Sequence, residues 1–232
     1  TSNFNVVLLA AGLSSRMKEG TSKTMKIVNG ETILNRLISQ FENSASNIII
    51  VTGFMRLEVE SHIVKKDKVI FVHNEKFKED KNILSCFLGL EESSGASLIV
   101  EADVILSDAD AEKIVNAIIK NPKSSFVCSQ VFSKGNMKRI GCVSDHLYLL
   151  PNPDTQNKDN RMAGVFYLSQ KDSSSLLESQ RSFIDKKDFS KYYFTPILND
   201  KNVYDLENFI VSSASHTVNT KEEYEWALKT LS

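Results

Sequence analysis

The sequence lacks the features that mark several large classes of protein. No uninterrupted apolar run approaches the roughly 20 residues that a helix needs to span a bilayer, and Thr1–Asn5 have neither the basic nor the apolar region of a signal peptide. The formal net charge of −1 creates no field that would attract nucleic acid or an anionic membrane. We therefore expect a cytoplasmic protein without a nucleic-acid or membrane partner.

The sequence patterns of several enzyme classes are missing as well. The four histidines are scattered without the spacing of a zinc site, and there is no Gly-x-Ser-x-Gly elbow to support a serine hydrolase. The three cysteines lie far apart in the chain, as expected for reduced, buried thiols. The chemistry must therefore lie in other residues.

What the sequence does contain is an alternation of strand and helix patterns in its first half, which predicts a mostly parallel sheet covered on both faces. Strands are expected at Phe4–Ala10, Asn47–Thr52, Val69–Val72 and Ser97–Ala102, and helices at Glu31–Phe41, Arg56–Lys65, Asn82–Leu90 and Asp108–Lys120. The second half has a different pattern, with strands expected at Ser125–Val131, Arg139–Ser144 and Gly164–Leu168, and helices at Ser169–Ser179, Lys187–Leu198 and Lys221–Leu231. We expect one domain over residues 1–232, with a lid-like loop at about 151–161.

A loop of small residues follows the first predicted strand. Such residues let backbone N–H groups approach the oxygens of a triphosphate, and nearby cations can stabilise its charge. No Gly-Lys-Ser/Thr sequence ends the loop, and a Gly-x-Gly-x-x-Gly set is absent, so it is neither a P-loop nor a dinucleotide fingerprint. An ordinary turn between strand and helix with two surface cations is the structural alternative. The candidate nucleotide-binding residues are Leu9, Ala10, Ala11, Gly12, Ser14 and Ser15, and the candidate catalytic cations are Arg16 and Lys23.

The stretch LAAGLSSRM, followed by SK and VNGETIL, resembles the signature of the nucleoside-triphosphate transferase family. The resemblance implies an α/β, three-layer Rossmann-like nucleotidyltransferase fold with a mixed, mostly parallel central sheet. It also implies that Arg16 binds phosphate and that Lys23 acts at the α-phosphate. Ser14 stands where many members of the family have a second glycine, and Ser22 replaces the proline that usually precedes the lysine.

Asp103 follows a predicted buried strand, at the edge where parallel sheets bind ligands. Mg²⁺ prefers one or two carboxylates together with phosphate oxygens, so Asp103 is the first candidate metal ligand. A capping or loop aspartate is the alternative. Glu101 is expected on the opposite face of the strand. The resemblance places a second metal ligand at Asn219, where the family usually has aspartate.

Residues 73–85 resemble a segment of phosphocholine and aminoethylphosphonate cytidylyltransferases in which the serine region contacts cytosine. This implies that Asn82 and Ser85 help to read the base, although a helix N-cap followed by an ordinary helical serine would give the same pattern. Aromatic residues Tyr193 and Phe194 fall where those relatives carry an aromatic–acid cluster, so they are candidate acceptor-binding residues. Packing in the core, with one tyrosine exposed, is the alternative.

The sequence therefore predicts a Mg²⁺-dependent cytidylyltransferase that transfers CMP from CTP to a small phosphorylated or phosphonate acceptor and releases pyrophosphate. The acceptor expected from the resemblance is phosphocholine-like or aminoethylphosphonate-like. Two alternatives stay open. One is a sugar-1-phosphate or molybdenum-cofactor nucleotidyltransferase, and the other is a nucleotide-binding protein with weak catalysis, suggested by Ser22 and Asn219.

Overall fold

A computed structural model describes residues 4–13, 20–129, 140–143, 146–149, 160–199, 203–204, 206–211, 216–218 and 220–231. The first half of the chain contains β1 (Asn5–Ala10), a short 3-10 helix (Lys23–Met25), β2 (Ile27–Val28), β3 (Glu31–Thr32), α1 (Ile33–Phe41), β4 (Ile48–Thr52), α2 (Arg56–Ser61), β5 (Val69–His73), α3 (Ile83–Ser93), β6 (Ser97–Glu101), β7 (Val104–Ile105) and α4 (Asp108–Lys120). The second half contains β8 (Ser125–Ser129), β9 (Ile140–Val143), β10 (His146–Leu149), β11 (Asn160–Leu168), α5 (Gln170–Asp185), α6 (Thr195–Asn199), β12 (Glu207–Val211), β13 (His216–Thr217) and α7 (Lys221–Leu231).

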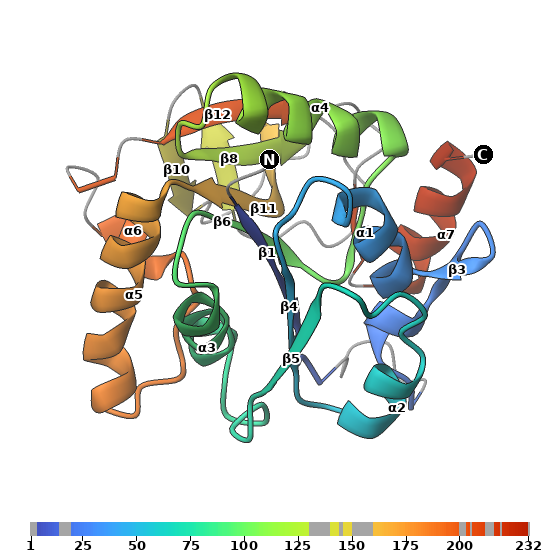
Figure 1. Cartoon of the computed structure of the whole chain (residues 1–232), viewed down its shortest axis with the longest axis horizontal. Helices are drawn as coiled ribbons and strands as arrows, with labels where there is room; N and C mark the ends of the chain where they lie inside the picture. The colour runs from blue at the N-terminus through green and yellow to red at the C-terminus, as the bar shows by residue number, and fades with distance from the viewer. Residues whose placement is uncertain are drawn as a thin grey trace.

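The central sheet is mixed and runs in the order β10-β9-β11-β6-β1-β4-β5. Strands β6, β1, β4 and β5 are parallel, whereas β11 lies antiparallel to β6 and also pairs with β8. Strand β1 therefore has β4 on one side and β6, which comes much later in the chain, on the other (Figure 1). The two neighbours of β1 are reached by crossovers on opposite faces, and this leaves a crevice at the carboxyl ends of β1 and β6.

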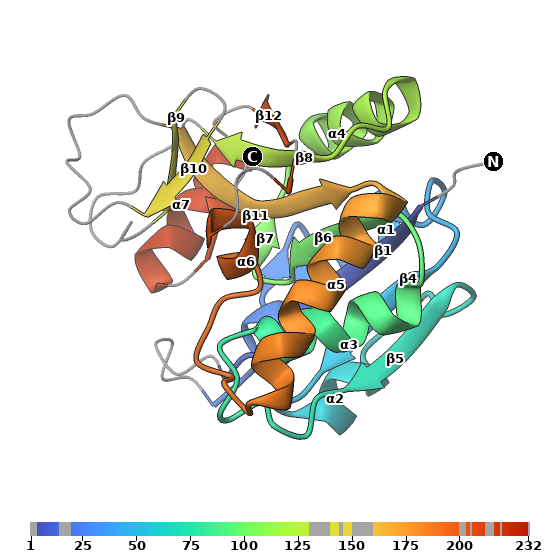
Figure 2. The ribbon, with the colours of Figure 1, turned by 90° about the vertical axis from the view of Figure 1, so that its left-hand side faces the viewer.

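Alternate residues of β1 pack against different helical layers. Val6 and Leu8 belong to the core on the face covered by α1, α4 and α7. Val7 and Leu9 belong to the core on the other face, together with residues of α3 and α5. Figure 2 shows α3 and α5 together on that second face. Because both faces of the sheet are covered, its central strands are apolar throughout, as in other parallel sheets.

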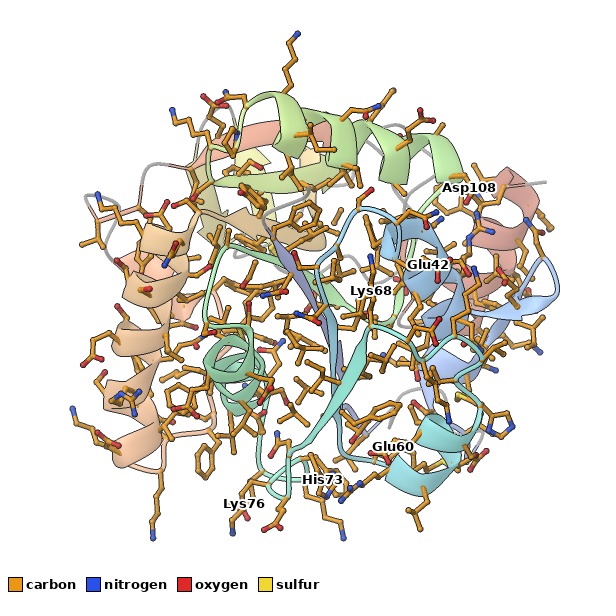
Figure 3. The ribbon with its side chains drawn as sticks, viewed as in Figure 1. Glu42, Glu60, Lys68, His73, Lys76 and Asp108 are labelled. Atoms are coloured by element: carbon orange, nitrogen blue, oxygen red, sulfur yellow. The ribbon has the colours of Figure 1, made fainter. Side chains whose placement is uncertain are left out.

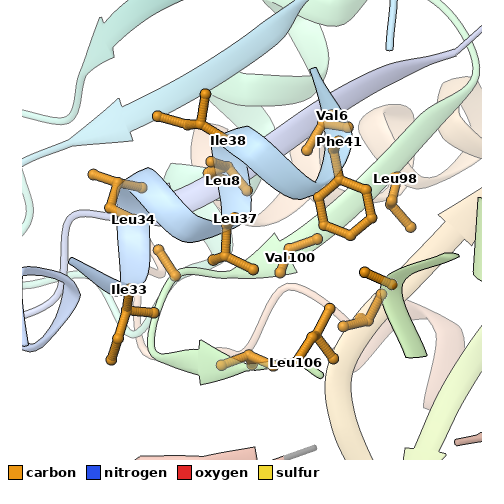
Figure 4. Close-up of a cluster of buried hydrophobic side chains, with 14 of the residues drawn as sticks. Val6, Leu8, Ile33, Leu34, Leu37, Ile38, Phe41, Leu98, Val100 and Leu106 are labelled. Atoms are coloured by element: carbon orange, nitrogen blue, oxygen red, sulfur yellow. The ribbon is translucent and has the colours of Figure 1, made fainter. Parts of the chain in front are cut away.

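Helix α1 shows how the first layer forms. Thr32 caps its start by accepting a hydrogen bond from the N–H of Asn35 at 3.1 Å. Its inward-facing residues, Ile33, Leu34, Leu37, Ile38 and Phe41, are all buried (Figure 4). Each such side chain contributes about 1.5–3 kcal/mol when it leaves water. The helix packs these residues on Val6 and Leu8 of β1 and on Leu98 and Val100 of β6.

Polar contacts join this layer to the loops around it. Arg36 of α1 donates to the carbonyl oxygen of Leu106 at 3.3 Å and to Asp108 Oδ1 at 3.0 Å, which fixes the start of α4. Lys68 Nζ donates to the Glu42 carbonyl oxygen at 2.7 Å. Figure 3 labels these two residues and Asp108. These contacts lie at the rim of the layer and hold the surrounding loops to it.

The fold-class prediction is confirmed, but several predicted elements have different bounds. Helix α5 runs to Asp185 and not to Ser179, and β11 begins at Asn160 and not at Gly164. Helix α2 ends at Ser61, not at Lys65, because the His62 N–H closes it on the Glu58 and Val59 carbonyl oxygens. Most of the helix predicted at Lys187–Leu198 is irregular. Lys187 has a positive φ of 54°, which ends the preceding helix and turns the chain. Of the predicted loop at 151–161, residues 160–161 belong to β11, and the rest lies outside the described residues.

Within the described residues, none of the helices has the length and apolar composition required to cross a membrane.

Candidate active site

A cavity of about 440 Å³ lies at the carboxyl ends of β1 and β6, at the crevice that the strand order creates. The end of β1 contributes small and apolar residues, whereas β6 and the loop after it contribute carboxylates. The residues that line it are Leu9, Ala10, Ala11, Gly12, Leu13, Ser22, Lys23, Thr24, Phe77, Asp80, Lys81, Asn82, Ser85, Glu101, Asp103 and Tyr192.

The described part of the small-residue loop, residues 10–13, forms one wall of this cavity. Its start is fixed by backbone hydrogen bonds, since Ala102 N–H donates to the Leu9 carbonyl oxygen at 3.1 Å and Phe54 N–H donates to that of Ala11 at 3.2 Å. Within the residues that the structure describes, a Cβ atom built at Gly12 would meet no protein atom within 4 Å. No packing contact among these residues requires glycine there, and the open space suits a ligand that approaches the backbone. The other predicted loop residues, Ser14, Ser15 and Arg16, lie outside the described residues.

Gly53 holds the loop against the next segment of the cavity wall. A Cβ atom at Gly53 would lie 2.6 Å from Phe77 Cβ and 2.8 Å from Ala11 Cβ, so only glycine permits this contact. The close approach brings Phe77 to the rim of the cavity beside the loop.

Lys23 and Asp103, which the sequence analysis assigned to different roles, meet in the cavity. Lys23 Nζ lies 3.5 Å from Asp103 Oδ2, and the two side chains are 13% and 21% exposed. Lys23 begins the short 3-10 helix, whose preceding residue Ser22 shares a 3.0 Å hydrogen bond with the Thr24 hydroxyl. Both hydroxyl-bearing residues are buried. The serine that replaces the usual proline is thus held by a contact of its own.

The chain that leads to Asn219 runs alongside Asp103. Strand β13 pairs with β7, and Val218 N–H donates to the Asp103 carbonyl oxygen at 3.0 Å. Asn219 itself lies outside the described residues. The described backbone that precedes Asn219 is therefore hydrogen-bonded to Asp103, the first candidate metal ligand.

The prediction that Glu101 faces away from the site is wrong. Glu101 is the last residue of β6 and Asp103 lies in the turn that follows, and both line the cavity. Burial, together with the nearby Asp103 carboxylate, raises the pKa of Glu101 to about 8, although Lys23 acts in the opposite direction. A Cβ atom at Gly164, whose φ is +73°, would lie 2.2 Å from Glu101 Oε2, so the carboxylate packs directly on this glycine.

The sequence analysis missed Asp80, which organises the start of α3. Its Oδ1 accepts hydrogen bonds from the N–H groups of Asn82 and Leu84, both at 3.0 Å, and its Oδ2 accepts from the N–H of Ser85 at 2.9 Å. The same Oδ2 accepts from the Ser85 hydroxyl at 2.8 Å and from Asn74 Nδ2 at 2.8 Å. An aspartate shortly before a predicted helix is a start signal that could have identified it.

Asn82 and Ser85 line the cavity, but contacts within the protein hold both side chains. The Ser85 hydroxyl donates to Asp80 and accepts from Asn74 Nδ2 at 2.9 Å. Asn82 Oδ1 accepts from Tyr193 N–H at 2.9 Å, and its Nδ2 lies 3.5 Å from Glu101 Oε1. Asn82 has a φ of 138°, and its side chain makes no capping hydrogen bond to α3. The side chain instead links the start of α3 to Tyr193 and to Glu101.

The burial of Tyr193 and Phe194 contradicts their assignment to direct acceptor contact. Both are at most 1% exposed, and they pack edge-to-face at 5.0 Å in the core beneath α3 and α5. Tyr192 is the aromatic residue of this segment that lines the cavity. The path of the backbone through residues 192–194 determines that Tyr192, and not Tyr193 or Phe194, faces the crevice. The sequence alone does not predict this.

Comparison with known proteins agrees with this geometry. The family model for the MobA-like NTP transferase domain matches residues 6–153. The choline-phosphate cytidylyltransferase of Haemophilus influenzae is 23% identical over 225 residues, which cover 88% of this chain and 93% of that protein. The bifunctional protein GlmU of Francisella philomiragia is 31% identical over 128 residues, which cover 50% of this chain and 28% of that protein.

Solved structures show the same fold at low identity. The CTP:phosphocholine cytidylyltransferase LicC of Streptococcus pneumoniae matches with a TM-score of 0.78 and 16% identity over 99% of this chain and 100% of that one. The inositol-1-phosphate CTP transferase of T. maritima matches with a TM-score of 0.69 and 12% identity over 100% and 97%. The chain belongs to the MobA-like NTP transferase domain family and is a cytidylyltransferase-like nucleotidyltransferase.

Proposed function

We propose that this protein transfers CMP from CTP to a small phosphorylated or phosphonate acceptor, of the size of phosphocholine or aminoethylphosphonate, and releases pyrophosphate. The observation that carries the proposal is the pairing of Lys23 with Asp103 at 3.5 Å, inside a cavity that the small-residue loop also lines. The relatives named for CTP-dependent transfer to phosphocholine and inositol phosphate support the choice of nucleotide.

The reaction is an in-line displacement at the α-phosphorus of CTP. An ionised acceptor oxygen forms the new P–O bond, the bond to the β-phosphate oxygen breaks, and its electron pair leaves with pyrophosphate. Because no proton has to be removed from the acceptor, positioning and electrostatic stabilisation account for the rate. The backbone of residues 9–13, with Ser14, Ser15 and Arg16, would hold the triphosphate, and Lys23 would stabilise charge on the α-phosphate.

The chemistry of the donor set fits Mg²⁺. Asp103 presents a partly exposed carboxylate to the cavity, and Mg²⁺ needs only one or two carboxylates when substrate phosphates complete its shell. Asp103 would hold the ion, with Asn219 as the second ligand. When bound, Mg²⁺ would neutralise part of the triphosphate charge. Lys23 would then exchange its contact with Asp103 for the phosphate oxygens.

We retain Asn82 and Ser85 as the residues that position the base. Both line the cavity, and Asp80 and Tyr193 fix their side chains before any ligand binds. Because both side chains are already held in place, the base would meet a preformed polar surface, and binding would require little reorganisation.

The test is pyrophosphate release with Mg²⁺, in which each of the four common nucleoside triphosphates is combined with phosphocholine, aminoethylphosphonate, inositol 1-phosphate or glucose 1-phosphate. We expect turnover with CTP and loss of turnover in Asp103→Ala. Asp108→Ala is the matched control, because this carboxylate is 81% exposed at the start of α4 and does not line the cavity.

Two results would replace the proposal. Turnover with another nucleotide and a sugar phosphate would indicate a sugar-1-phosphate transferase. Nucleotide binding without turnover, together with a large gain of activity in Asn219→Asp, would indicate a nucleotide-binding protein with a weakened site.

A further inference from the structure

Lys81 and Tyr192 form a cationic, aromatic patch in the wall of the cavity. Lys81 Nζ lies 5.5 Å from the centroid of the Tyr192 ring, within the range of a cation–π contact. Both residues line the cavity. The Lys81 ammonium group therefore already covers one face of Tyr192, the aromatic residue among residues 192–194 that lines the cavity.

The two halves of this patch are tied together by backbone contacts. Lys81 N–H donates to the Phe189 carbonyl oxygen at 3.0 Å, and Tyr193 N–H donates to Asn82 Oδ1 at 2.9 Å. On its other side, the Tyr192 ring stacks on Phe194 at 5.2 Å with an angle of 9° between the planes. The patch is therefore built into the junction between α3 and the segment before α6, so binding a ligand there requires little reorganisation.

The other ionisable groups of the cavity have partners within the protein. Asp80 accepts hydrogen bonds from the start of α3, Lys23 pairs with Asp103, and Glu101 lies against Asn82 and Gly164. In the part of the chain that the structure describes, Lys81 makes no ion pair with a carboxylate. Its charge is available to a ligand.

We infer that Lys81, stacked over Tyr192, selects an acceptor that carries a carboxylate at the end remote from its reacting phosphate or phosphonate. A quaternary ammonium would need a free aromatic face and would be repelled by a cation placed there. Here the Tyr192 face already carries the Lys81 ammonium group, and the acidic residues that line the cavity, Asp80, Glu101 and Asp103, are engaged by partners within the protein. A carboxylate instead forms a charge-assisted hydrogen bond with Lys81. This inference rests on the proposed function and narrows its acceptor.

The test compares two phosphonates of similar size and opposite end charge, 3-phosphonopropionate and 2-aminoethylphosphonate. With CTP, we expect kcat/KM for 3-phosphonopropionate to exceed that for 2-aminoethylphosphonate by about tenfold or more. Lys81→Met should lower kcat/KM for 3-phosphonopropionate by about the same factor through KM, without lowering it for the ammonium compound. The KM for CTP should stay unchanged.

Lys78→Met is the matched control. Lys78 lies in the same segment with its Nζ 6.0 Å from the Phe77 ring, but it does not line the cavity, so neither phosphonate should change. Because Lys81 is exposed, its replacement should leave the thermal unfolding midpoint unchanged.

Preference of the wild-type protein for 2-aminoethylphosphonate or phosphocholine would overturn the inference. A raised KM for CTP in Lys81→Met with an unchanged acceptor ratio would also overturn it, because Lys81 would then serve the nucleotide. Failure of the proposed function is a separate result, namely no pyrophosphate release with any nucleotide. In that case the affinities of the two phosphonates for the protein are compared by calorimetry. Equal binding of the two, or no binding of either, would refute the role of Lys81 in selecting the acceptor.

Discussion

Asp80 is the residue whose removal should have the largest effect at the start of α3. Its carboxylate accepts three backbone N–H groups, the Ser85 hydroxyl and Asn74 Nδ2. Loss of a helix cap costs about 1 kcal/mol. A buried donor left without an acceptor costs a further 1–3 kcal/mol or so, and Asn74 is completely buried. We therefore expect Asp80→Ala to lower the free energy of unfolding by about 2–4 kcal/mol.

The assay is urea unfolding followed by far-ultraviolet circular dichroism, with Ser107→Ala as the comparison. Ser107 caps α4 with a single hydrogen bond to the Asp110 N–H at 3.1 Å, so its loss should cost only about 1 kcal/mol. Equal losses in the two variants would refute the reasoning, because they would show that Asp80 acts as an ordinary cap. If the reasoning holds, Asp80→Ala should also raise the KM for the nucleotide, since Asn82 and Ser85 lose their support.

Three further predictions concern packing, ionisation and charge. Gly89→Ala should lower the free energy of unfolding by about 1–3 kcal/mol in the same urea assay. The added Cβ would lie 2.4 Å from Val7 Cγ1, and this overpacking outweighs the gain in helix propensity. Glu101 keeps its proton in the folded state between its ordinary pKa of 4.5 and about 8, so stability should fall as the pH rises through this window, and Glu101→Gln should remove that slope in metal-free urea titrations. Lys23→Met should lower the kcat of pyrophosphate release by about a hundredfold, because charge on the α-phosphate loses its cation.

Each of these predictions has an outcome that contradicts it. Gly95→Ala, which meets no atom closer than 3.8 Å, is the control for Gly89, and similar losses in both would exclude a packing effect. Parallel stability–pH curves for the wild-type protein and Glu101→Gln would show that the carboxyl group is not proton-bound in this range. Lys26→Met is the control for Lys23, because Lys26 is a partly buried lysine beside Tyr224 that does not line the cavity. Equal rates in the two variants would remove Lys23 from the mechanism.

Much of the functional site follows from local sequence. Apolar runs that end in small or acidic residues identified β1, β4 and β6, and with them the loop at Ala10–Gly12 and the carboxylate of Asp103. Lys23 was predicted as a catalytic residue from its position in the family signature that the sequence resembles. These signals are local, because a strand end and the turn of small residues after it are determined by neighbouring residues.

The tertiary structure alone decided which side chains share the cavity. The pairing of Lys23 with Asp103, the inward position of Glu101 and the exposure of Tyr192 in place of Tyr193 depend on contacts between segments far apart in the chain. Asn82 contacts Tyr193 across more than a hundred residues, and Lys81 is brought onto Tyr192 by the same junction. Sequence patterns specify the chemistry of individual segments, whereas packing of α3 and the turn before α6 on the sheet determines which of those groups can act together.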